Sequence, residues 1–179
     1  MENKIKRIAK TLGITASICV VATVMWVIFD RFNVAPLILM NPLTKGYLHL
    51  SMSHFLTNLL IIFPALLSPV NSSYGFKKIY RVTFIISLIY LPVELLGLSQ
   101  TAIGLSGTGY FLISRYFFSW RERSQLGVFI ISILALLELG ASVNTSADKT
   151  AHFVHIIGIA LGYISLRYAH KKGLEKLGL

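Results

Sequence analysis

Six long apolar runs follow one another along almost the whole chain, and they limit what it can fold into. The runs cover approximately residues 14–30, 50–67, 80–98, 102–120, 126–141 and 151–168. A helix needs about 20 apolar residues to cross the roughly 30 Å hydrocarbon core of a bilayer. Only 13% of the residues are charged, whereas soluble domains carry about 25%. The sequence therefore predicts an all-α, polytopic membrane protein, a single six-helix bundle formed by residues 1–179.

The distribution of basic residues predicts the orientation of this bundle. With the N-terminus in the cytoplasm, the loops alternate such that only Arg31, Lys45 and Lys149, of 17 Lys and Arg residues, fall outside. Cytoplasmic loops of membrane proteins are enriched in Lys and Arg, so we expect both termini to be cytoplasmic. The protein is expected to be a multi-pass component of a prokaryotic cell membrane. No basic stripe interleaved with aromatic residues accompanies the net charge of +10, so a nucleic-acid partner is not expected.

Four polar residues in the second, fourth and sixth runs share one predicted depth. These helices all enter from the outer face, which places His54, Asn58, Ser106 and His155 roughly 6–12 Å inside their outer ends. A single buried Ser or His usually has a structural explanation, such as a hydrogen bond to a backbone carbonyl one turn back. Polar groups at this depth are nevertheless unfavourable unless they face partners or water. Their common depth favours one shared site.

The spacing around His155 predicts which helices meet at that site. His155, Gly158 and Gly162 lie three and seven residues apart, on one stripe of a helix. Glycines on a stripe let a neighbouring helix approach closely. If that neighbour is the fourth helix, His155 reaches Ser106. A serine hydroxyl becomes a nucleophile when a base lies beside it, and His155 is the candidate base.

The remaining polar groups fit supporting tasks in acyl transfer. His54 and Asn58 share a helix face, and together with the Ser106 backbone N–H they would supply donors to an oxyanion. No carboxylate falls at this depth, so the pattern favours a Ser–His dyad over a triad. Tyr110, one turn from Ser106, is expected to pack against His155 and fix its imidazole.

Taken together, these residues resemble those of the rhomboid family of intramembrane serine proteases. The matching patterns, in order along residues 14–168, are His49-x4-His54-x3-Asn58, Gly104-x-Ser106-Gly107 with Tyr110, and His155-x2-Gly158-x3-Gly162. The resemblance implies that Ser106 is the nucleophile and His155 its base. It also implies an oxyanion hole of His54, Asn58 and the Ser106 backbone, a Tyr110 ring stacked on the histidine, and a structural or water-organising role for His49.

Two features depart from the family pattern. The link after the first helix is short and lacks the Trp-Arg pair that many members carry there. His152 adds a second imidazole one turn before His155. Only His155 has the glycine spacing, so the base is assigned to it. Apart from these two departures, the chain is expected to form a minimal six-helix core.

The predicted activity is hydrolysis of peptide bonds in transmembrane segments of other membrane proteins, near the outer face. The partners are then membrane protein substrates and lipids, with no cofactor and no metal; the oligomeric state is not indicated. One alternative is an inactive relative that binds membrane clients without cutting them, although such relatives usually lose the Ser or His. Another is a zinc site built from His49, His54, His152 and His155. No Cys or carboxylate joins these histidines in the helices.

Overall fold

In a computed structural model the described residues are 2–32, 52–71, 73–96, 105–119, 133 and 149–177. They form the helices α1 (Glu2–Phe32), α3 (Met52–Leu67), α4 (Phe76–Leu95), α5 (Ser106–Ser119) and α7 (Lys149–Leu177), with a 3-10 turn η2 (Pro69–Asn71). The prediction of an all-α fold is confirmed for these residues. The predicted fifth helix, 126–141, lies outside them apart from residue 133.

Helices α1 and α7 are longer than the apolar runs that predicted them. α1 begins at Glu2 instead of residue 14, and α7 continues to Leu177 instead of ending near residue 168. The added turns are rich in Lys, Arg, Ala and Leu, which are strong helix formers. An apolar run marks only the part of a helix that would lie in hydrocarbon, so a helix that continues beyond it is underestimated.

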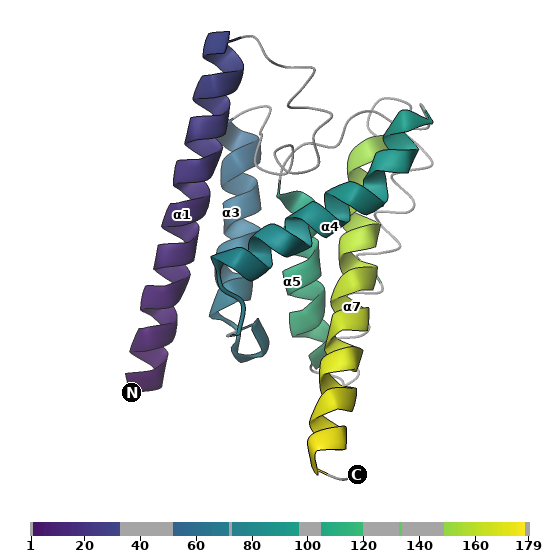
Figure 1. Ribbon diagram of the computed structural model, residues 1–179. Helices are drawn as coiled ribbons and strands as arrows, with labels where there is room; N and C mark the ends of the chain where they lie inside the picture. Colours follow the sequence, from purple (N-terminus) through teal and green to yellow (C-terminus); the bar gives the residue numbers. More distant parts are fainter. Residues whose placement is uncertain are drawn as a thin grey trace.

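The arrangement of the helices places α5 in the middle of the bundle (Figure 1). α3 and α7 lie on either side of α5, α4 crosses it obliquely, and α1 lies beside α3. α3, α5 and α7 run in the same direction and begin at the same end of the bundle (Figure 1). The first turn of α1 and the last turn of α7 lie at the opposite end.

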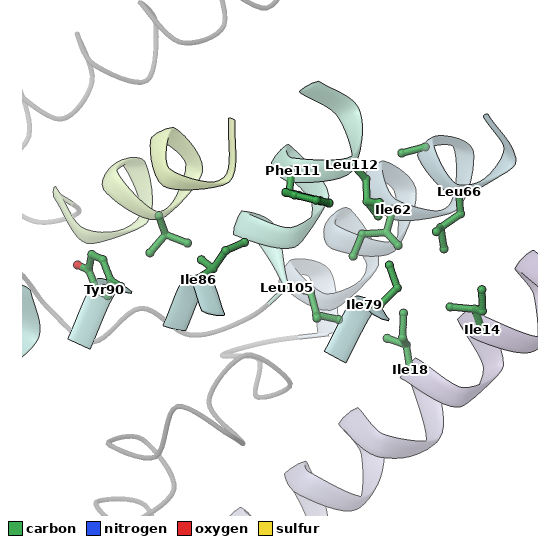
Figure 2. Close-up of a cluster of buried hydrophobic side chains, with 12 residues drawn as sticks. Ile14, Ile18, Ile62, Leu66, Ile79, Ile86, Tyr90, Leu105, Phe111 and Leu112 are labelled. Carbon is green, nitrogen blue, oxygen red and sulfur yellow. The ribbon is translucent and has the colours of Figure 1, made fainter. Parts of the chain in front are cut away.

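The apolar core packs side chains of α1, α3, α4 and α7 against α5 (Figure 2). Its fully buried members include Ile18 of α1, Ile62 of α3, Ile79 of α4 and Leu112 of α5. Leu105, just before α5, is also fully buried. The start of α5 is therefore held by packing from several sides.

Other large apolar side chains face outward. Val20, Leu60 and Ile164 are 62%, 75% and 58% exposed. Within the described part of the chain, Ile5–Met25 is the one stretch both long and apolar enough to cross a membrane, and Phe55–Leu67 is a shorter apolar helix. Six membrane crossings with cytoplasmic termini remain a prediction.

Candidate active site

Three glycines bring the backbones of α5 and α7 into contact. A Cβ atom added to Gly158 would collide with the carbonyl oxygen of Gly107 and lie 3.2 Å from the backbone nitrogen of Phe111. A Cβ on Gly162 would collide with Ser114 Oγ and lie 2.5 Å from the Phe111 carbonyl oxygen. No side chain larger than hydrogen fits at either position without movement of α5. The glycine stripe of α7 thus faces α5.

This contact brings together the helix turns that carry Ser106 and His155. A Cβ on Gly107 would lie 2.5 Å from Val154 Cγ1 and 3.2 Å from the Val154 carbonyl oxygen. Ser106 precedes Gly107 at the first residue of α5, and His155 follows Val154. Both side chains are half-buried. The start of α5 and the second turn of α7 therefore meet, and Ser106 and His155 each adjoin a residue of this contact.

The Tyr110 ring lies flat against the His155 ring. Their centroids are 4.2 Å apart and the planes differ by 13°. Tyr110 lies one turn after Ser106 on the same face of α5, so the stack holds the imidazole against the helix face that also carries the serine. His152 is placed differently, since its ring is perpendicular to that of His155 at 6.2 Å.

Asn58 of α3 lies level with the start of α5. Gly109 of α5 packs against Ile61 and Ile62 of α3, with a Cβ added to Gly109 3.0 Å from Ile61 Cγ2 and 3.5 Å from Ile62 Cγ1. Asn58 is one turn before Ile62 on the same helix face. Because α3 and α5 run in the same direction (Figure 1), one turn toward their common end brings Asn58 to the level of residue 105.

The Asn58 side chain is an unusual buried group. It is 2% exposed, and within the described part of the chain its amide nitrogen Nδ2 has no hydrogen-bond acceptor. More than nine in ten buried polar groups in proteins are hydrogen-bonded, so an exception calls for an explanation. A donor held without an acceptor is suited to a charge that develops only during a reaction.

α4 anchors the start of α5 from another side. The hydroxyls of Thr83 and Thr108 share a 2.8 Å hydrogen bond, and Thr83 Oγ1 also donates to the Ile79 carbonyl oxygen at 3.0 Å. Both threonines are buried. Thr108 is two residues beyond Ser106, so this bond restricts movement of the helix turn that carries the serine.

Several residues predicted from the sequence lie outside what the structure describes. These are His49 and Gly104, together with the side chain of His54, whose backbone belongs to the first turn of α3. Among the described residues, no group of three or more His, Cys, Asp or Glu is arranged to hold a metal ion.

The sequence analysis did not single out Arg115, although it lies inside the fourth apolar run. Its side chain is 5% exposed and hydrogen-bonds to Asn71 and Ser165, which are far away in sequence. An ionisable residue inside an apolar run is by itself a signal of a functional or structural site. That signal was present in the sequence.

Comparison with known proteins identifies the family of this chain. A family model described as the Rhomboid domain matches residues 36–172. Searches of curated proteins and of solved structures gave no significant match. The match covers most of the chain, including α3, α4, α5 and nearly all of α7. The chain therefore belongs to the rhomboid family.

Proposed function

We propose that the protein is an intramembrane serine endopeptidase in which Ser106 is the nucleophile and His155 the general base. Rhomboid proteins are embedded in membranes and are generally serine proteases. The observation that carries the proposal is the meeting of α5 and α7: Gly107 against Val154, and Tyr110 stacked on His155. It sets a serine and an oriented imidazole on facing turns.

The proposed reaction follows from these positions. Ser106 Oγ attacks the scissile carbonyl carbon while His155 accepts the hydroxyl proton, which makes the serine nucleophilic. The tetrahedral intermediate collapses as His155 returns the proton to the leaving amine. Water then attacks the acyl-enzyme by the same route in reverse, with His155 again as base. Tyr110 would replace the carboxylate of a catalytic triad in one respect only: it would restrain the orientation of the imidazole.

Asn58 is the proposed oxyanion donor, assisted by the Ser106 backbone N–H and His54. The Asn58 side chain is buried, level with the start of α5, and its amide nitrogen has no acceptor among the residues that the structure describes. A donor that gains its acceptor only when the oxyanion forms stabilises the transition state more than the ground state. His49, Gly104 and Gly107 would support the same site.

Asn58→Ala is expected to lower kcat about 10²–10³-fold, the usual effect of losing one oxyanion donor. Folding stability should be unchanged or higher, because an unsatisfied buried polar group costs about 1–3 kcal/mol. Cleavage of a fluorogenic transmembrane peptide in detergent, together with thermal unfolding, measures both quantities. A parallel loss of stability and activity would instead make Asn58 a structural residue.

The proposed substrates are transmembrane segments of other proteins, cut near the outer face. A helical segment hides its carbonyls in its own hydrogen bonds, so it must unwind to reach Ser106. This location follows if the protein crosses the membrane six times with both termini in the cytoplasm, because α3, α5 and α7 then begin at the outer side.

Labelling with a fluorophosphonate probe tests the proposal against that of an inactive client-binding relative. We expect the wild type to be labelled and Ser106→Ala not to be. Ser119→Ala is the matched control: its hydroxyl, on the same helix, bonds to the Tyr116 carbonyl oxygen at 2.6 Å, and its labelling should equal that of the wild type. Absence of wild-type labelling, or equal labelling of Ser106→Ala, would overturn the assignment.

A further inference from the structure

Arg115 is a buried cation at the end of α5 opposite to Ser106. Its guanidinium donates three hydrogen bonds, from Nε to Asn71 Oδ1 at 3.1 Å, from Nη1 to Ser165 Oγ at 2.6 Å and from Nη2 to the Val70 carbonyl oxygen at 3.4 Å. The acceptors belong to η2 and α7. One side chain of α5 therefore links Asn71 and Ser165, which lie 94 positions apart in the sequence.

The guanidinium is also enclosed by aromatic rings. Its central carbon lies 5.0 Å from the centroid of the Tyr74 ring and 5.9 Å from that of Phe111. In cation–π contacts of this kind the negative face of the ring attracts the cation. All three hydrogen-bond acceptors are neutral oxygens, so the positive charge is held by dipoles and rings. Such a cation is unfavourable in an apolar interior unless its donors are satisfied.

Asn71 extends the same network into α3 and α5. It is fully buried, and its Nδ2 donates to the carbonyl oxygens of Ala65 at 3.0 Å and Leu112 at 2.9 Å. Its Oδ1 accepts from Arg115. The Arg115–Asn71–Ser165 cluster thus fixes the end of α3, the second half of α5 and the middle of α7 relative to one another.

The Arg115–Asn71–Ser165 cluster is separated from the candidate active site by similar distances along α5 and along α7. Arg115 lies nine residues from Ser106, and Ser165 lies ten residues from His155. At 1.5 Å per residue these separations are about 14 Å along α5 and about 15 Å along α7. Because the two helices run in the same direction, the axial register that joins Arg115 to Ser165 also places Ser106 opposite His155.

The glycine contacts that lie between the cluster and the candidate active site do not by themselves fix the axial register of α5 against α7. Small residues set how closely two helices approach, whereas hydrogen bonds have preferred directions and lengths. Besides Arg115–Ser165, the α5–α7 contact includes a bond from Ser114 Oγ to the Ile159 carbonyl oxygen at 3.2 Å. The guanidinium bond is the shorter of the two and is charge-assisted, and such bonds are roughly twice as strong as neutral ones.

We infer that Arg115 is a positioning residue, which sets the axial register of α5 against α7 and thereby aligns Ser106 with His155. This inference rests on the proposed function. Arg115 acts through the two helices and touches neither reacting group. Lysine cannot replace it fully, since a single ammonium does not offer the planar fork that reaches acceptors on two elements.

The test compares Arg115→Met and Arg115→Lys with Arg167→Met, which removes an exposed cation of α7. Two readouts are taken in detergent. One is the rate and final extent of fluorophosphonate labelling. The other is the NMR shift of the His155 ring C–H, which the stacked Tyr110 ring displaces upfield; His155→Ala assigns the signal. We expect Arg115→Met to label at least tenfold more slowly but to the same final extent, with a changed His155 shift. Arg115→Lys should be intermediate and Arg167→Met unchanged.

The other outcomes are equally decisive. A wild-type labelling rate and an unchanged His155 shift in Arg115→Met would overturn the inference. A reduced final extent at wild-type rate would also overturn it, because that result describes a purely structural residue whose loss unfolds part of the sample. If the wild type itself were not labelled, the proposed function would fail, and the His155 shift alone would still decide whether Arg115 sets the register.

Discussion

Replacing His155 with alanine is expected to lower kcat for transmembrane peptide cleavage by about 10⁴-fold, the upper end of the usual contribution of a general base. Without a base beside it, a serine hydroxyl at neutral pH is a weak nucleophile. KM should change little, because the imidazole contributes chiefly to the transition state. Steady-state cleavage of a fluorogenic peptide in detergent measures both constants.

His152→Ala is the matched control for this substitution. The two histidines lie three residues apart on α7. The His155 ring is stacked on Tyr110, whereas the His152 ring stands perpendicular to the His155 ring, 6.2 Å away. We expect His152→Ala to retain activity within about threefold, a difference of less than 1 kcal/mol in transition-state stabilisation. A large loss in His152→Ala with little effect of His155→Ala would transfer the role of base to His152.

The glycine pattern shows which parts of the site could be predicted from the sequence. Gly158 and Gly162 are separated by one helical turn from each other and follow His155 on the same stripe, and this periodicity alone indicated a close contact with another helix. The structure identifies α5 as the partner through the contacts of Gly158 and Gly162 with Phe111. Local spacing was sufficient because a helix converts sequence periodicity directly into a face.

Arg115 and Asn71 show what local spacing could not provide. Their hydrogen bonds join residues 44 and 50 positions apart, and nothing in the periodicity of α5 specifies such partners. Asn71 lies in a polar link whose sequence indicates only that a helix ends there, yet Asn71 is fully buried. The burial of this link residue depends on how the end of α3 packs against α5, which is a property of the tertiary structure.

The observed boundaries of α1 and α7 differ from the predicted ones for a related reason. Hydropathy describes the solvent that a segment prefers, whereas helix formation depends on backbone hydrogen bonds and intrinsic propensity. Lys6 and Lys10 at one end of the chain, and Lys171 at the other, are unfavourable in hydrocarbon but favourable in a helix. They therefore extend α1 and α7 beyond the predicted limits.

Gly162→Ala is expected to destabilise the folded protein by about 3 kcal/mol, the upper part of the range for overpacking a tight core. The added methyl would collide with Ser114 Oγ and lie 2.5 Å from the Phe111 carbonyl oxygen. The serine hydroxyl can move aside, but the carbonyl belongs to the backbone of α5. Thermal unfolding in detergent should show a midpoint about 6–12 °C lower, at about 2–4 °C per kcal/mol for a chain of this size.

Gly173→Ala on the same helix separates this effect from helix propensity. A Cβ at Gly173 would meet no atom within 4 Å, and alanine is favoured over glycine in a helix by about 1 kcal/mol, so stability should rise slightly. Adding Ser114→Gly to Gly162→Ala should restore only part of the loss, since the Phe111 carbonyl still obstructs the methyl. Full recovery in that double variant would show that the serine side chain alone limits the approach of α7. A Gly162→Ala protein as stable as the wild type would mean that α5 and α7 are not in backbone contact, and the alignment of Ser106 with His155 would lose its structural basis.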